Sequence, residues 1–336
     1  MQGIDEIKTL LSEPRKVLVT MHRKPDGDAL GSALALYFYL MAKGHDPIVV
    51  SPTDYGVYLH WMPGNPSVLI WEENKKGIQK YIDQAELIFC LDFNNLGRIE
   101  DMGESIRLSP AKKIMIDHHL EPEGFEDYRL WNPEACATAE LVYKFIGLLG
   151  DEAIIDKNMA ICLYTGIMTD SGSFQYSNVS PQVHLITAHL MSTGMDHTMI
   201  HRNIYDTMKE SQLRFFGHCI KEKLVILPKF RAAYISVNKE ELRQYNILTG
   251  DTEGLVNYTM SLSETVVGAL IVERDKVVKL SLRSKGNFPV NEIAKKYFHG
   301  GGHINAAGGT SYENLQQTIA KFEEAVKEFE ILLLNN

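Results

Sequence analysis

Short runs of β-branched and apolar residues alternate with longer helical patterns through the first half of the chain. Strands are predicted at four such runs: Lys16–Met21, Pro47–Ser51, Leu87–Leu91 and Lys113–Ile116. Strands that alternate with helices are typical of βαβ units, in which helices cover both faces of a parallel sheet. The pattern therefore predicts an N-terminal α/β domain with a parallel sheet.

The helical patterns of this half begin and end at residues suited to capping. The segment Ala29–Lys43 is rich in Ala, Leu and Tyr; it follows Asp28, a predicted N-cap, and stops before Gly44. Three more helices are predicted over Thr138–Leu149, Lys157–Met168 and Pro181–Ser192, the last with proline in its first turn.

The pattern changes in the second half of the chain, which predicts a smaller α+β domain. Strands are predicted over Lys223–Leu227, Phe230–Val237, Val266–Glu273 and Val277–Arg283, helices over Val290–Phe298 and Leu315–Leu332, and a glycine-rich turn over Gly300–Gly309. A polar-faced helical segment precedes them. The predicted domains are therefore residues 1–194 and 223–336, joined by a helical connector over residues 195–222.

Composition narrows the classes of function. The 336 residues carry a formal charge of −9, which argues against a protein that grips long duplex nucleic acid along its backbone. The four cysteines form no C-x-x-C pair, so a reducing, cytoplasmic location is expected. No apolar run approaches about 18 residues, so no membrane association is expected.

Acidic and imidazole side chains follow directly on three of the predicted strands, and one more acid follows a helix. These residues are His22, Asp26, Asp28, Asp92, the triplet Asp117-His118-His119, and Asp170. Ligands of open α/β sheets bind outside the carboxyl ends of the strands, so we expect these side chains to converge. Taken alone, each residue also fits a helix cap, a turn or a polar side chain on the surface.

Carboxylates with a few imidazoles suit hard or borderline divalent cations, so Mn²⁺ is expected, with Mg²⁺ as the alternative. Four aspartates and two histidines carry four negative charges, which two divalent cations would balance.

A second motif lies in the C-terminal half. Gly300, Gly301 and Gly302 precede His303, and Arg283 ends a predicted strand upstream. Glycines let backbone N–H groups approach an anion closely, although a helix C-cap and loop would use them too. We favour an anion-binding site. Arg98, six residues after Asp92, fits a substrate contact and a solvated arginine equally well.

These motifs together resemble the DHH phosphoesterase family, in its two-domain form with a DHH-associated C-terminal domain. The resemblance spans nearly the whole chain and is closest to bacterial members that combine oligoribonuclease activity on very short RNA with 3′-phosphoadenosine 5′-phosphate phosphatase activity. It implies a cytoplasmic hydrolase of the exoribonuclease type with two Mn²⁺ ions, and a homodimer is consistent with the family.

The resemblance also implies roles for individual residues. One metal site would use His22, Asp26 and Asp92, and the other Asp28, Asp92, His118 and Asp170. Asp92 would bridge the two metals, His119 would face the substrate phosphate, and Asp117 would support its neighbours. Arg283, Gly301, Gly302 and His303 match the substrate-binding half, whereas His299 stands where the family commonly has glycine.

Three alternatives stay open. A cyclic di-AMP or linear dinucleotide phosphodiesterase of the same family would use the same residues. A family II inorganic pyrophosphatase would share the metal motifs but closes its site with a segment rich in lysine and arginine, where this chain has Gly-Gly-Gly-His. A non-enzymatic nucleotide sensor is expected to have lost one or more metal ligands, and all six candidates are present.

Overall fold

The computed structural model describes residues 3–248 and 250–334, and the chain divides between Thr207 and Met208 into two compact units. This boundary falls inside the predicted connector, 195–222. Helix α8 (His197–Tyr205) belongs to the first unit and helix α9 (Glu210–His218) to the second.

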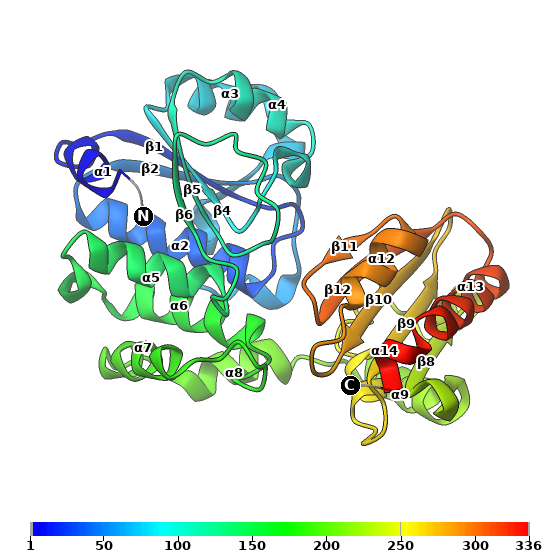
Figure 1. Ribbon diagram of the computed structural model, residues 1–336. Coiled ribbons are helices and arrows are strands. Elements are labelled where there is room, and N and C mark those ends of the chain that lie inside the picture. The colour runs from blue at the N-terminus through cyan, green and yellow to red at the C-terminus, as the bar shows by residue number, and fades with distance from the viewer. Residues whose placement is uncertain (1–2, 249, 335–336) are drawn as a thin grey trace. The chain divides into compact units, whose positions relative to one another are not determined.

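A six-stranded parallel sheet forms the centre of the first unit, which confirms the predicted α/β class (Figure 1). Its strands are β1 (Lys16–Met21), β2 (Asp46–Ser51), β3 (Val68–Ile70), β4 (Leu87–Leu91), β5 (Lys112–Asp117) and β6 (Tyr128–Trp131), in the order β3-β2-β1-β4-β5-β6. The four predicted strands are confirmed to within one residue at each end. The pattern missed β3 and β6, two short edge strands whose side chains are mostly half-buried.

Helices cover both faces of this sheet, because successive strand residues point to opposite sides. Val17, Val19 and Met21 of β1 pack in one apolar cluster with α2 (Gly27–Ala42), α5 (Thr138–Leu148) and α6 (Lys157–Asp170). Leu18 points the other way, toward α3 (Lys75–Gln84) and α4 (Met102–Leu108). The sheet is therefore buried on both sides.

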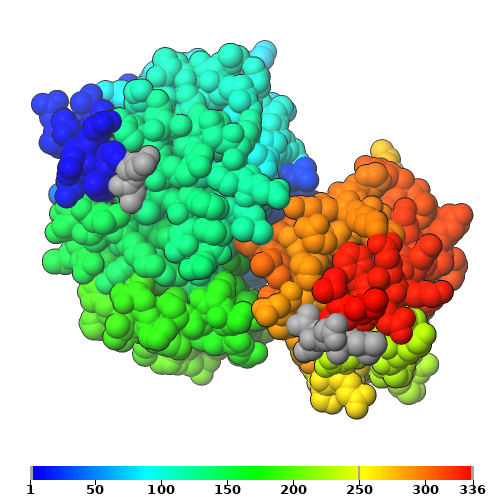
Figure 2. Space-filling model, viewed as in Figure 1, coloured from blue at the N-terminus to red at the C-terminus, as the bar shows by residue number. Residues whose placement is uncertain are grey.

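The remaining helices of the first unit are α1 (Ile4–Leu10), α7 (Pro181–Ser192) and α8. Helices α7 and α8 contact α6 and form part of the surface of this unit, so the layer of α2, α5 and α6 lies between them and the sheet (Figures 1 and 2).

The start of α2 differs from the prediction in one residue that matters for the site. Asp26, and not Asp28, is the N-cap: its Oδ1 accepts hydrogen bonds from the N–H groups of Asp28 and Ala29, both at 3.0 Å. Such bonds satisfy donors that the first helical turn leaves without partners. Asp28 is the second residue of α2, and its buried side chain contacts the start of α5 instead.

The second unit contains a mixed six-stranded sheet, which confirms the predicted α+β class. Its strands are β7 (Leu224–Leu227), β8 (Ala232–Val237), β9 (Val267–Glu273), β10 (Val278–Ser284), β11 (Gly301–Gly302) and β12 (Ala306–Ser311), in the order β11-β12-β10-β9-β8-β7. Strands β8 and β9 are parallel, and all other neighbours are antiparallel.

The predicted glycine-rich turn over Gly300–Gly309 is wrong, because most of this segment is strand. Gly301 pairs with Gly308 and Gly302 with Ala307, so the glycines form the β11–β12 hairpin and only residues 303–305 turn. Glycine weakens the strand pattern in a sequence because it has no side chain to pack, which hid the two strands.

Helices α9, α10 (Lys239–Gln244), α11 (Asn257–Met260), α12 (Val290–Phe298), α13 (Leu315–Glu328) and α14 (Glu330–Leu334) complete the second unit. The single helix predicted over Leu315–Leu332 is divided at Phe329. In the part of the chain that the structure describes, no helix is long and apolar enough to cross a membrane. All four cysteines are buried and unpaired.

Candidate metal centre

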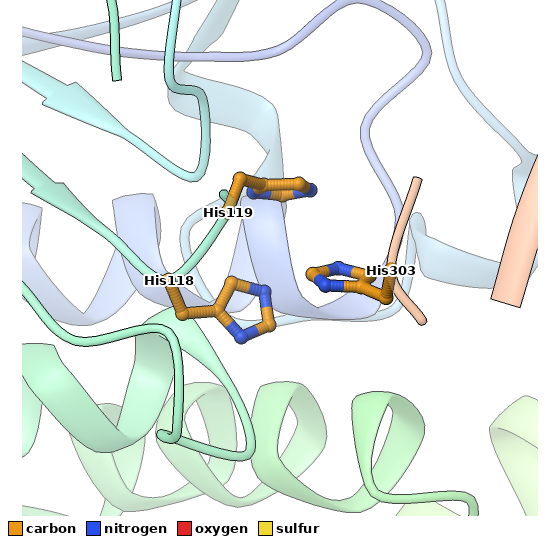
Figure 3. A group of neighbouring side chains, drawn as sticks. All are labelled: His118, His119 and His303. Carbon is orange, nitrogen blue, oxygen red and sulfur yellow. The ribbon is translucent and has the colours of Figure 1, made fainter. Parts of the chain in front are cut away.

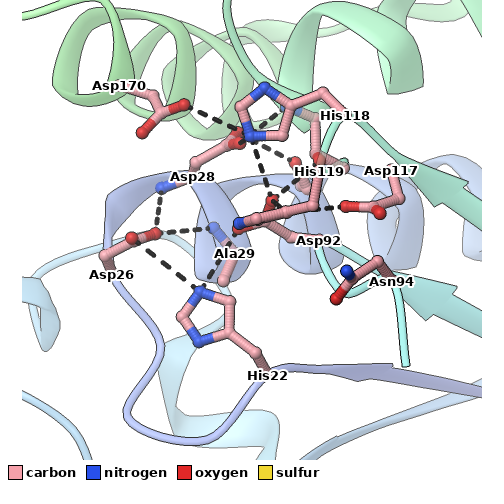
Figure 4. Close-up of polar contacts among 12 residues, drawn as sticks. His22, Asp26, Asp28, Ala29, Asp92, Asn94, Asp117, His118, His119 and Asp170 are labelled. Carbon is pink, nitrogen blue, oxygen red and sulfur yellow. Dashed lines mark hydrogen bonds and ion pairs between the residues drawn. The ribbon is translucent and has the colours of Figure 1, made fainter. Parts of the chain in front are cut away.

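The candidate site lies where the direction of the sheet connections reverses. From β1 the chain adds β2 and β3 on one side, and then returns to add β4, β5 and β6 on the other. Strands β1 and β4 are therefore neighbours, and the loops that leave their carboxyl ends diverge. This is the position at which open α/β sheets bind ligands, and the residues after β1, β4 and β5 meet there (Figure 4).

Asp92 is at the centre of the site, one residue after the end of β4. Its backbone has a φ of 62°, in the left-handed region that only a few non-glycine residues adopt. Its Oδ2 lies 3.3 Å from Nε2 of His22, and its Oδ1 lies 3.5 Å from Nε2 of His118. The carboxylate thus faces histidines from two different loops.

His22 is oriented by its own loop. Its Nδ1 lies 2.8 Å from the carbonyl oxygen of Arg23, which fits an Nδ1–H donor and turns Nε2 toward the carboxylates. Nε2 also lies 3.8 Å from Oδ2 of Asp26, whose Oδ1 caps α2. One aspartate therefore fixes the start of the helix with one oxygen and faces the site with the other.

His118 is oriented in the same way on the opposite side of Asp92. Its Nδ1 lies 3.1 Å from the carbonyl oxygen of Ala135, and its Nε2 lies 3.4 Å from Oδ2 of Asp170 and 4.0 Å from Oδ2 of Asp28. Asp170 is the last residue of α6, which runs two residues beyond the predicted Met168.

Asp28 is held by the N-terminus of α5. Its Oδ2 accepts a hydrogen bond from the N–H of Thr138 at 2.6 Å, and its Oδ1 accepts one from the N–H of Ala139 at 2.8 Å. The α5 N-cap, Ala137, has no side chain to cap the helix, so Asp28 takes that role from 110 residues away. This buried carboxylate also ties α2 to α5.

Close packing of the helices brings these acids together. A Cβ on Gly31 of α2 would lie 2.4 Å from the carbonyl oxygen of Cys162, and a Cβ on Gly166 would lie 2.8 Å from Oδ1 of Asp28. Only glycine, which has no Cβ, allows α2 and α6 to pack this closely. Asp170, at the end of α6, therefore lies beside the turn after β1.

The electrostatics of this cluster favour bound cations. Burial and the neighbouring charges of Asp92, Asp170 and Asp26 raise the pKa of Asp28. Burial also raises the pKa of Asp170, to about 7, against the opposing effect of His118. Burial raises the pKa of Asp92 as well, but the hydrogen bond with His22 and the nearby histidines bring it well below its usual range. Like charges at this spacing repel unless cations lie between them.

The donor geometry fits divalent cations. Ligand-capable atoms of His22, Asp26 and Asp92 lie within 4.8 Å of one another, and so do those of Asp28, Asp92 and His118. Two atoms that each bind the same cation at about 2.0–2.2 Å can lie no further apart than twice that bond length, which is close to the observed spacing. Asp92 belongs to both groups, and Asp170 joins the second through His118.

His119 and Asp117 lie beside Asp92 at the edge of this cluster, with Nδ1 of His119 3.6 Å from Oδ1 of Asp92. Nδ1 of His119 lies 2.8 Å from Oδ1 of Asp117, and the rings of His118 and His119 meet edge to face at 4.9 Å (Figure 3). Burial lowers the pKa of His119, although Asp117 and Asp92 oppose this effect. The other carboxylate oxygen of Asp117 is buried with no hydrogen-bond partner among the described residues.

Several contacts in the site could not be predicted from the sequence. The hydroxyl of Thr138 donates to Oδ1 of Asp92 at 2.9 Å, and the Ala135 carbonyl orients His118. Thr138 was visible only as a helix start. Arg98 is half-buried in the turn Leu96–Ile99 and contributes, after burial, to the lowered pKa of His119, so its charge acts on the site.

The second unit brings together its own predicted residues. Arg283 of β10 pairs with Ala306 of β12, and the N–H of His303 donates to the carbonyl oxygen of Ala306 at 2.8 Å. Arg283 therefore lies beside the strand that carries the hairpin tip. Its Nε is buried with no hydrogen-bond partner within the described ranges, which fits a cationic group that binds an anion.

Gly301 and Gly302 of the hairpin differ in the space available for a side chain. Gly302 has a φ of 139°, and a Cβ there would lie 2.5 Å from the carbonyl oxygen of Ala306. Gly301 has nothing within 4 Å of the position of a Cβ. The fold therefore requires glycine at 302, whereas the open space at 301 leaves room for a ligand to approach the backbone.

Comparison with protein families and curated proteins identifies relatives of both units. The model of the DHH family N-terminal domain matches residues 16–167, and that of the DHHA1 domain matches residues 231–329. A bifunctional oligoribonuclease and PAP phosphatase, NrnA, from Thermus thermophilus is 29% identical over 329 residues, which cover 98% of this chain and 94% of the relative.

Solved structures also include a relative of nearly the whole chain. An exopolyphosphatase-related protein from Bacteroides fragilis is 37% identical, with a TM-score of 0.95, and the match covers 98% of this chain and 97% of that protein. RecJ from Thermus thermophilus, solved in complex with Mn²⁺, matches 98% of this chain and 55% of its own length with a TM-score of 0.56 and 11% identity. The second likeness shows a shared fold.

Proposed function

The chain belongs to the DHH family, and from that membership we propose that it is a metal-dependent phosphoesterase. Its proposed substrates are very short oligoribonucleotides, hydrolysed to mononucleotides, and 3′-phosphoadenosine 5′-phosphate, hydrolysed to AMP and phosphate. The name of the Thermus thermophilus relative, which matches over nearly the full length of both chains, supports both activities.

The observation that carries the proposal is that Asp92 is shared by two groups of ligand-capable atoms, one with His22 and Asp26 and the other with Asp28 and His118. We assign His22, Asp26 and Asp92 to one cation, and Asp28, Asp92, His118 and Asp170 to the other. Aspartate oxygens with imidazole nitrogens suit Mn²⁺, with Mg²⁺ as the alternative. When bound, a pair of such cations supplies positive charge to the phosphoryl oxygens and lowers the pKa of water.

His119 and Asp117 carry the proton chemistry of the proposal. In this proposal Asp117 accepts a hydrogen bond from the Nδ1–H of His119, which fixes the tautomer and stabilises the charged ring. Nε2 is then the atom that exchanges a proton with the substrate. In hydrolysis the oxygen of water bonds to phosphorus and releases a proton to the solvent, the bond from phosphorus to the leaving oxygen breaks, and His119 supplies a proton or hydrogen bond to that oxygen.

Residues of the second unit bind the ligand in this proposal. Arg283 supplies a guanidinium, and Gly301, Gly302 and His303 supply the hairpin backbone and an imidazole. Arg98 is assigned to the same task in the first unit. The acidic net charge of the chain is unfavourable for binding a long polyanion, so we propose short RNA and small nucleotides as its partners. We also propose that the protein is located in the cytoplasm and forms a homodimer.

A substrate panel tests the function. The purified protein is incubated with Mn²⁺ and, separately, a diribonucleotide, 3′-phosphoadenosine 5′-phosphate, cyclic di-AMP, a 20-residue RNA and pyrophosphate. Products are separated by chromatography, with EDTA and Asp92→Asn as controls. We expect turnover of the first two substrates and none in either control.

Three other results would identify the alternative functions. Faster turnover of cyclic di-AMP than of the diribonucleotide would assign the chain to the alternative phosphodiesterase. Faster turnover of pyrophosphate would make it a pyrophosphatase, and metal binding without any turnover would leave a nucleotide sensor.

A further inference from the structure

The loop that carries His119 is held by two side chains that belong to neighbouring strand ends. The indole Nε1–H of Trp131, the last residue of β6, donates to the carbonyl oxygen of His119 at 2.7 Å. On the other side, Nδ2 of Asn94 donates to the carbonyl oxygen of Leu120 at 2.6 Å. Two consecutive carbonyl groups therefore have a donor each, from residues before and after them in the chain.

Trp131 is placed for this contact by the sheet register. It pairs with Asp117 across β5 and β6, so its side chain starts level with the residue that binds Nδ1 of His119. The side chain is 37% exposed. The hydrogen bond therefore fixes the indole at the carboxyl edge of the sheet without burying the ring in the core.

Asn94 belongs to a larger connection between the loops after β4 and β5. Its backbone carbonyl accepts the N–H of Glu123 at 2.8 Å, and its Oδ1 accepts Nδ2 of Asn95 at 2.9 Å, which orients the amide. The rings of Phe93 and Phe125 stack at 5.8 Å with an interplanar angle of 8°. Hydrogen bonds and an aromatic contact therefore connect the loop with Asp92 to the loop with His119.

We infer that Trp131 and Asn94 are positioning residues for His119. They hold the backbone of residues 119 and 120 so that the imidazole, already fixed at Nδ1 by Asp117, keeps one direction. This inference rests on the proposed function, because it assigns the two residues to the step in which His119 acts on the substrate. Neither side chain needs to touch the substrate.

The test compares Trp131→Phe and Asn94→Ala with wild type. Trp131→Phe keeps an aromatic ring but removes the donor, and we expect kcat for the diribonucleotide to fall roughly three- to tenfold, with KM changed less than twofold. Trp71→Phe is the matched control, because its indole donates to Asp101 at 2.9 Å in the same unit. That control should keep the wild-type kcat.

A double-mutant cycle separates positioning from other roles. In a His119→Gln background, Trp131→Phe should cause no further loss of turnover, because it acts through the ring that is missing. Hydrogen exchange provides a readout without turnover: amides of residues 118–123 should exchange faster in Trp131→Phe and Asn94→Ala, and at the wild-type rate in Trp71→Phe.

Three results would overturn the inference. They are a wild-type kcat in Trp131→Phe, an equal further loss in the His119→Gln background, and a rise in KM for nucleotides that is absent for bis-p-nitrophenyl phosphate. The last would show that the ring contacts a base. If wild type turned over none of the substrates, the proposed function would fail, whereas an active wild type with any of these three results defeats only the positioning role.

Discussion

Asp92 and Asp117 are both buried aspartates at strand ends, but their surroundings differ. Asp92 faces His22 and His118 and lies 3.6 Å from Nδ1 of His119, whereas Asp117 contacts His119 at 2.8 Å. In the proposal the first binds two cations and the second orients a neighbour. The distinction can be measured at the scale of single residues.

We predict that Asp92→Asn abolishes both turnover and Mn²⁺ binding, whereas Asp117→Asn lowers turnover by about 10–100-fold and still binds Mn²⁺. Asparagine has nearly the volume of aspartate, so packing is retained while the charge is lost. Isothermal titration calorimetry with Mn²⁺ and turnover of the diribonucleotide are the two measurements. Similar mild effects of both substitutions would refute the bridging role of Asp92.

The two hairpin glycines give a second residue-scale prediction. Gly302→Ala should lower the free energy of unfolding by about 1–3 kcal/mol, because its backbone conformation and the nearby Ala306 carbonyl oppose a Cβ. Gly301→Ala should change that free energy by less than about 0.5 kcal/mol but raise KM for the diribonucleotide. Urea unfolding and steady-state kinetics test the pair, and an unchanged KM in Gly301→Ala would remove residue 301 from the ligand site.

Among the elements, α12 ends in a way that explains the unusual His299. This residue is the C-cap and has a φ of 46°, a left-handed conformation that favours glycine. Its ring contacts Tyr312 edge to face at 5.6 Å. A histidine at this position therefore has a strained backbone, and its ring gains one aromatic contact.

We expect His299→Gly to raise the free energy of unfolding by about 0.5–1 kcal/mol, because relief of the left-handed strain exceeds the loss of one exposed ring contact. His299→Ala is the control: it keeps the strained conformation and loses the contact, so it should not stabilise the protein. Thermal unfolding measures both variants. Equal stabilisation by Ala and Gly would show that the histidine ring, and not the backbone, is unfavourable.

At the scale of the whole molecule, the proposed metal ligands all belong to the first unit. Two histidines and four aspartates come from residues 22–170, and the repulsion among their carboxylates should limit the stability of this unit without cations. A cation that binds only the folded state stabilises it by mass action.

Mn²⁺ at about one hundred times its Kd should stabilise the folded state by about 2.7 kcal/mol, which for a unit of this size raises Tm by roughly 5–10 °C. Differential scanning calorimetry with and without EDTA measures this shift. Asp92→Asn should show no shift, whereas Arg283→Ala, in the second unit, should keep it. A shift lost in Arg283→Ala would show that the second unit takes part in metal binding.

Patterns within short segments were enough to predict strands β1, β2, β4 and β5, helices α2, α5, α6 and α7, and the places where acids and histidines follow strand ends. These features are local, because burial and capping leave periodic patterns within a few turns of chain. The same patterns were too weak for the short edge strands β3 and β6 and for the glycine hairpin, whose residues pack few side chains.

The role of each acid depends on contacts between residues that are far apart in the chain. Asp26 and Asp28 look alike in the sequence, yet the first caps its own helix and the second caps α5, which begins 110 residues later. The left-handed backbone of Asp92, the contact from Thr138 and the donors to the His119 loop were equally hidden. Such partners are far apart in the chain, and they meet only because the folded helices and strand ends place them together.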